Sequence, residues 1–207
     1  MSSSEERELA VSFVNELGGQ VEHGESLWKQ VPGTVVDLYG TSLTDEGLKR
    51  LAPFDDVVRL DLTDTRITDA GLRELTIFGK IDELLLGDTA VTDAGMVEVA
   101  RLRSLDYLYL GGTEVTDEGL KALAPLENLA ILMLGGTAIT DAGLKHLASL
   151  PSLRAVALQG VAITDEGLRV LGTITTLTEI GLGGNRTTAT GIAQLRQLLP
   201  NCEVREE

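Results

Sequence analysis

The feature that most constrains this chain is a repeat with a period of 24 residues. A threonine recurs at that interval, and a glycine follows each threonine three residues later. The threonines are Thr44, Thr68, Thr92, Thr116, Thr140, Thr164 and Thr188, and the glycines are Gly47, Gly71, Gly95, Gly119, Gly143, Gly167 and Gly191. An acidic residue follows the threonine in every copy except the last, where Ala189 stands. A fixed period of this size indicates a solenoid of stacked units.

Residues 105–128, LDYLYLGGTEVTDEGLKALAPLEN, show what one unit is. The apolar and polar alternation at 108–110 predicts a short strand with one buried face, and the glycines at 111–112 predict a turn. Thr116 has the place of a helix N-cap, with acidic residues in the first turn where the helix dipole favours them. Leucines at 120 and 123 form a buried helical stripe that Pro125 ends. The unit is therefore strand, turn, short helix and return.

One such unit cannot bury its own apolar side, whereas stacked copies pack equivalent residues on one another. The columns that would do so are Leu38, Leu62, Leu86, Leu110, Leu134, Leu158 and Leu182; then Leu48, Leu72, Met96, Leu120, Leu144, Leu168 and Ile192; and Phe54, Phe78, Leu102, Leu126, Leu150, Ile174 and Leu198. The expected fold is an α/β solenoid with a parallel sheet on one side and short helices on the other.

The pattern L-x-x-L-x-L-x-x-T-x-[IV]-T-D-x-G-L-x-x-L, over about residues 33 to 204, resembles leucine-rich repeats. Its TDxGL variant resembles bacterial and F-box-associated proteins of the ribonuclease-inhibitor-like class. The resemblance implies a curved horseshoe with the sheet on its concave face, and a non-catalytic module for protein–protein interaction. Where leucine-rich repeats carry Asn or Cys, this chain has Thr41, Thr65, Thr89, Thr113, Thr137, Val161 and Asn185. Because Val161 has no polar side-chain group, we expect a gap in that polar ladder.

The two ends of a solenoid expose apolar surface and require caps. The spacing of Leu9, Phe13 and Leu17 predicts a helix at about residues 4 to 17, followed by a short strand near 20–22. Trp28 is expected to lie in the core of this cap rather than to form a ligand platform. Val204 indicates a truncated eighth strand. We therefore divide a single domain into an N-terminal cap (1–32), seven repeats (33–200) and a C-terminal cap strand with a tail (201–207).

Net charge and the lack of long apolar runs limit the kinds of partner and location that we expect for this chain. A formal net charge of −15 argues against nucleic acid. No apolar run reaches the roughly 18 residues of a membrane span, and MSSSEERE lacks the regions of a signal peptide. If the chain is not an excerpt of a longer one, we expect a cytoplasmic protein that needs no cofactor and is monomeric or weakly self-associating.

Catalysis is not expected, because His23, His146 and Cys202 lack partners with which they would form an active site, and the regular repeats leave no long inserted loop. The recurring aspartates at 45, 69, 93, 117, 141 and 165 could in principle bind calcium. Calcium needs about six to eight oxygen ligands, and the GGxGxD repeat is missing, so helix capping is the favoured interpretation.

The open face of the predicted sheet, the face without helices, is the candidate site. It would carry an apolar patch of Leu85, Tyr107, Tyr109, Ile131 and Met133, with a rim of Asp37, Arg59, Asp61, Glu83, Asp106 and Arg154. Exposed apolar residues on strands can be ordinary surface. We favour the alternative that this patch is an interaction centre with a polar rim.

Three functions remain open for that face. The favoured one is binding of a protein partner whose periphery is basic, since Asp37, Asp61, Glu83 and Asp106 would surround the patch. The second is binding of a small ligand or glycan, with Tyr107 and Tyr109 as stacking platforms. The third is self-association. A smooth sheet face makes a poor enclosed pocket, which favours the protein partner.

Overall fold

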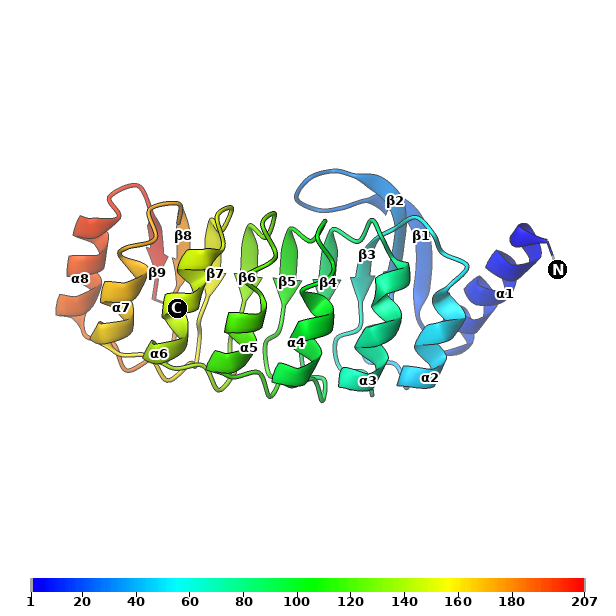
Figure 1. Ribbon diagram of the computed structural model, residues 1–207, viewed down its shortest axis with the longest axis horizontal. Helices are drawn as coiled ribbons and strands as arrows, with labels where there is room; N and C mark the ends of the chain where they lie inside the picture. The colour runs from blue at the N-terminus through cyan, green and yellow to red at the C-terminus, as the bar shows by residue number, and fades with distance from the viewer. Residues whose placement is uncertain (1, 207) are drawn as a thin grey trace.

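The computed structural model describes residues 2–206, and within them one sheet of nine strands is covered on one face by helices (Figure 1). The strands lie in chain order: β1 (Gln20–Glu25), β2 (Pro32–Asp37), β3 (Val57–Asp61), β4 (Glu83–Leu85), β5 (Tyr107–Tyr109), β6 (Ile131–Met133), β7 (Ala155–Ala157), β8 (Glu179–Gly181) and β9 (Glu203–Arg205). All neighbours from β2 to β9 pair in parallel, whereas β1 pairs antiparallel with β2. The predicted α/β solenoid is confirmed.

One helical segment follows each strand of the repeats (Figure 1). The helices are α1 (Ser3–Glu16), α2 (Asp45–Leu48), α3 (Asp69–Leu72), α4 (Asp93–Val99), α5 (Asp117–Ala122), α6 (Asp141–Leu144), α7 (Asp165–Leu171) and α8 (Ala189–Leu198). The 3₁₀ turns η1 (Lys49–Leu51), η2 (Arg73–Ile77) and η3 (Lys145–Ser149) extend α2, α3 and α6. None of the helices in residues 2–206 is long and apolar enough to cross a membrane.

The core lies between the sheet and the helices, and the predicted ladders fill it. The first two ladders are buried along their whole length. The third is buried except at its last member, Leu198, which is 54% exposed. Helix α8 continues through Leu198, and each helical residue turns by about 100° from the last. Leu199 therefore occupies the buried place, and the prediction for Leu198 is wrong.

The recurring Thr-Asp-x-Gly sequence joins each repeat to the next. Every recurring threonine is an N-cap whose hydroxyl accepts a backbone N–H, as predicted. The following aspartate accepts two more hydrogen bonds, from the next threonine. For Asp45 the Thr68 N–H donates at 2.8 Å and the Thr68 hydroxyl at 2.7 Å. The same pair recurs in five more copies.

This bond also accounts for the glycine and for the exception at Ala189. A Cβ added at Gly71 would collide with the Asp45 carboxylate, which accepts the hydrogen bonds from Thr68. The prediction that glycine avoids a clash with the adjacent repeat is thus confirmed. No N-capping threonine follows α8 within residues 2–206, and Ala189 occupies the position that carries the aspartate elsewhere.

The gap expected at Val161 is filled by another residue. In four repeats a threonine hydroxyl donates to the leucine carbonyl three residues earlier, as Thr137 does to Leu134 at 2.7 Å. At Val161 the Asn185 side chain of the next repeat donates instead to the Leu158 carbonyl, also at 2.7 Å. The prediction is wrong because a longer side chain reaches back across one repeat.

Both ends carry the expected elements. Helix α1 buries Phe13 and Val14 against the first repeat, and the Arg50 guanidinium lies 3.7 Å from the centre of the Phe13 ring. Strand β9 extends the sheet, with Val204 beside Ile180. The boundaries at residues 32 and 200 remain a prediction.

Candidate interaction site on the open face of the sheet

Register brings the predicted apolar patch together. Tyr107 lies beside Ile131, and Tyr109 lies between Leu85 and Met133 on the neighbouring strands. All five patch residues are half-buried and project from the face opposite the helices. Five large apolar side chains are thus contiguous on a surface that no helix covers.

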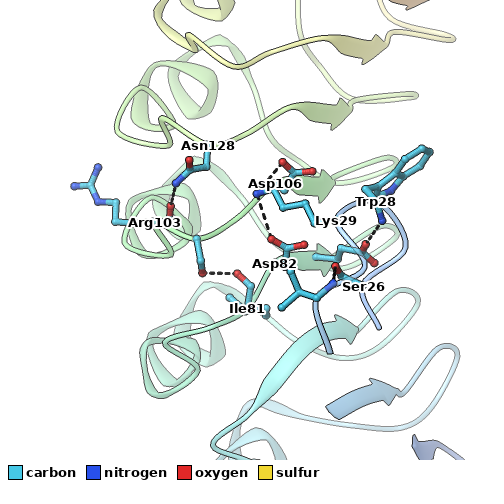
Figure 2. Close-up of polar contacts among 11 residues, drawn as sticks. Ser26, Trp28, Lys29, Ile81, Asp82, Arg103, Asp106 and Asn128 are labelled. Atoms are coloured by element: carbon cyan, nitrogen blue, oxygen red, sulfur yellow. Dashed lines mark hydrogen bonds and ion pairs between the residues drawn. The ribbon is translucent and has the colours of Figure 1, made fainter. Parts of the chain in front are cut away.

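The loop between β1 and β2, residues 26–31, lies over part of this face, and we call it the strap (Figures 1 and 2). The Trp28 ring stacks on the Tyr107 ring, with centroids 6.1 Å apart and planes inclined by 12°. Trp28 is 56% exposed, so the prediction that it lies in the cap core is wrong. The antiparallel pairing of β1 with β2 carries this residue out of the cap and onto the neighbouring strands.

Ionic and backbone contacts hold the strap in place (Figure 2). Lys29 Nζ lies 2.9 Å from a carboxylate oxygen of Asp106 and 3.4 Å from one of Asp82. Burial alone would lower the pKa of Lys29, but the hydrogen bond to Asp106 and the charges of both carboxylates outweigh it and raise that pKa. The Trp28 N–H donates to the Glu83 carboxylate at 3.1 Å. The strap is therefore fastened to β4 and to the residues just before β4 and β5.

Glu83 is a buried carboxylate beneath the strap. Its residue is 1% exposed, and burial raises its pKa, against the lowering effects of the Trp28 N–H and of Arg59. The nearest Arg59 nitrogen lies 3.8 Å from the carboxylate. The Trp28 N–H and Arg59 thus compensate only part of the cost of burying the charged form of Glu83.

The predicted acidic rim is largely absent from the surface. Asp61, Glu83 and Asp106 are 8%, 1% and 6% exposed. The strap covers Glu83 and Asp106, while Asp61 accepts the Thr63 N–H at 3.0 Å. The prediction that these three form an exposed rim is therefore wrong. The expectation of a basic partner rested on that rim and loses its main support. Of the other rim residues, Asp37 and Arg154 are exposed and Arg59 is half-buried.

A hollow of about 470 Å³ lies between the strap and the starts of the following strands. Trp28, Lys29 and Asp106 line one side of it. The other side carries Ile131, Arg154, Ala155 and Glu179, with smaller polar residues between them. The open face is consequently not the smooth surface that the sequence indicated.

The strap residues Trp28 and Lys29 were not among the predicted site residues. The signal available for them was a tryptophan and a lysine in a polar segment between two strands, because binding residues concentrate in loops. Their neighbours on the sheet could not be read from the repeat period, since the strap stands outside it.

The other chemically capable residues lie apart from one another. His23 is on β1, His146 is on η3 and Cys202 precedes β9 at the far end of the sheet. Burial raises the pKa of Cys202, which favours the neutral thiol. Among residues 2–206, no group of three or more His, Cys, Asp or Glu could hold a metal ion.

Two segments of the chain match the family described as Leucine Rich repeat: residues 57–75 and 101–124. The first spans β3 and α3, and the second spans β5 and α5 with the turns between them. A comparison with curated proteins finds no match. The two matches, together with the parallel sheet and its row of helices, support a leucine-rich repeat protein and agree with the solenoid fold.

Proposed function

We propose that the chain is a non-catalytic module that binds a partner protein on the open face of its sheet. The observation that carries this proposal is the contiguous patch of Leu85, Tyr109, Ile131 and Met133, bordered by the stacked rings of Trp28 and Tyr107. Binding energy at protein interfaces concentrates in aromatic and large apolar residues near the centre. Proteins of this fold are typically interaction modules without enzymatic activity, which supports the same function.

Several narrower features belong to the proposal. The ribonuclease-inhibitor-like class with TDxGL repeats fits the short helices that begin at each Thr-Asp pair. The net charge of −15 supports a partner other than nucleic acid. A cytoplasmic location and a monomeric or weakly self-associating state remain predictions.

The test captures interacting proteins with the wild-type chain and with two double variants. Tyr109→Ala/Met133→Ala alters the centre of the patch without touching the strap. Lys121→Ala/Lys145→Ala changes exposed residues on the helix side and is the matched control. We expect the first pair to weaken a specific partner by at least ~2 kcal/mol, about 30-fold in Kd, and the second pair to change it little.

Sedimentation of the purified chain distinguishes a separate partner from a second copy. A monomer at micromolar concentration, with a partner that depends on Tyr109 and Met133, supports the proposal. A partner that the control pair abolishes and the patch pair leaves intact would place the site on the helix side instead.

A further inference from the structure

Among the charged residues that line the hollow beside the strap, Arg154 differs from the others in its lack of an ion pair. Lys29 lies 2.9 Å from Asp106 and 3.4 Å from Asp82. Arg205 lies 2.8 Å from Glu179 and 2.9 Å from Glu203. Arg154 is exposed and lines the same hollow. Among the residues that the structure describes, no carboxylate oxygen lies within 4.0 Å of the Arg154 guanidinium. The Arg154 guanidinium is therefore free to pair with a carboxylate of a partner, whereas Lys29 and Arg205 are already engaged.

Part of the lining of the hollow is apolar. The exposed Trp28 ring stands on one side, and Ile131 and Ala155 lie on neighbouring strands of the other. An anionic group beside Arg154 would consequently have apolar surface within reach. A free inorganic anion would use the guanidinium and leave that surface exposed.

The shape favours a chain segment over a single side chain. The lining residues come from the beginnings of β5 to β8, so the hollow crosses three strand spacings, or about 14 Å at roughly 4.8 Å each. An extended peptide advances about 3.3 Å per residue, and about four residues would span that length.

We propose that this hollow binds an extended segment of a partner protein that carries an acidic side chain beside a large apolar one. Arg154 is the partner of the carboxylate, and Trp28 is the apolar wall against which the neighbouring side chain packs. This assignment rests on the proposed function and specifies the chemistry of the partner. It is opposite in charge to the partner that the sequence indicated, because three of the four carboxylates expected to form the rim, Asp61, Glu83 and Asp106, are buried.

The first experiment selects peptides from a displayed library of random dodecamers on the intact chain. The hollow should enrich sequences that contain Asp or Glu next to Leu, Ile, Phe or Trp. Enrichment of basic sequences would overturn the proposal, as would an acidic motif that Arg154→Glu selects equally well.

The second experiment measures binding of the enriched peptide through tryptophan fluorescence. Trp28 is the single tryptophan of the chain, so the signal comes from the wall of the hollow. Arg154→Glu should weaken binding by about 10-fold or more, because it replaces an attractive charge by a repulsive one, and Arg154→Lys should weaken it less. Lys145→Glu makes the same change of charge on an exposed helix-side position and should leave binding unaltered.

The outcomes separate this proposal from the proposed function. If Tyr109→Ala abolishes binding of the peptide and Arg154→Glu does not, the open face is an interaction surface and the assignment to the hollow is wrong. If neither substitution matters, both proposals fail. Thermal unfolding of each variant verifies that the exposed substitutions leave the fold intact.

Discussion

Leu134 and Tyr109 lie on neighbouring repeats but on opposite sides of the sheet, and their environments predict different costs of truncation. Leu134 is completely buried within its ladder, whereas the Tyr109 ring is half-buried on the open face. Leu134→Ala should lower the free energy of unfolding by roughly 2–5 kcal/mol, since it leaves a cavity between two repeats. Tyr109→Ala should cost much less. Urea unfolding of both variants makes the comparison, and equal costs would contradict this assignment of the two faces.

The buried carboxylate of Glu83 predicts a stability that depends on pH. Its pKa is raised in the folded protein by burial, so the folded state holds the proton more tightly than the unfolded state does. The corresponding stability is present below the ordinary pKa of 4.5 and is lost as pH rises through the raised value. Glu83→Gln removes this titration and keeps an acceptor for the Trp28 N–H.

The stability of Glu83→Gln relative to the wild type should therefore increase from pH 4 to pH 7. Urea unfolding at a series of pH values measures it, and the exposed Glu127→Gln is the control with no such trend. A difference that stays constant with pH, or that decreases toward neutral pH, would show that burial does not govern the proton on Glu83.

At the scale of the element, adjacent helices are joined by a contact between aspartate, threonine and glycine. The Asp45 carboxylate accepts two hydrogen bonds from Thr68 and occupies the space that a side chain at residue 71 would need. Gly71→Ala should destabilise the protein by about 1–3 kcal/mol, although alanine is otherwise the better helix former. Asp45→Ala should cost about 1–3 kcal/mol through the lost hydrogen bonds.

The double variant tests whether these two effects share one cause. Asp45→Ala removes the carboxylate with which the new Cβ collides, so the double variant should be more stable than the sum of the single costs by about 0.5–3 kcal/mol. Pairing Gly71→Ala with the distant Asp165→Ala should give additive costs. Additivity in both pairs would mean that the glycine is required for a reason other than this aspartate.

The period of 24 predicted most elements because each follows from local chemistry. The N-cap at Thr116 depends on neighbours within one unit, and the burial of Leu134, just after β6, follows from a leucine at the same position of every unit. The hydrogen bonds from Thr68 to Asp45 and from Asn185 to the Leu158 carbonyl join two units. They depend on distances between units, which a pattern of residue types does not give. The predicted burial of Leu198 was wrong because the last helix continues further than its predecessors.

At the scale of the whole molecule, the solenoid consists of units that contact their neighbours, and the strap is the departure from that rule. Between repeats, strand pairs with strand and helix packs on helix in sequence order. The strap passes β3 and reaches Glu83 and Tyr107 on the two strands beyond it. No periodic pattern predicts such a contact, and the predicted exposure of Asp61, Glu83 and Asp106 was therefore wrong. The placement of the interaction site on the open face stays a prediction.

Contacts between neighbours predict that one complete unit can be removed. Deleting residues 108–131 joins Tyr107 to Leu132 and restores the apolar alternation of the strand, with 24 residues lost from 207. Helix α4 then meets α6, and Asp93 can accept the hydrogen bonds of Thr140 that Asp117 accepts now. We expect a folded chain whose dependence of unfolding free energy on urea falls by roughly an eighth, in proportion to the surface exposed.

Deleting only residues 108–130 leaves one extra strand residue, and a shift by one residue turns apolar side chains to the wrong face of the sheet. That variant should be clearly less stable than the 24-residue deletion, although it retains more of the chain. Circular dichroism and urea unfolding compare the two. If the shorter deletion were equally stable, register between units would not be what holds the ladders together.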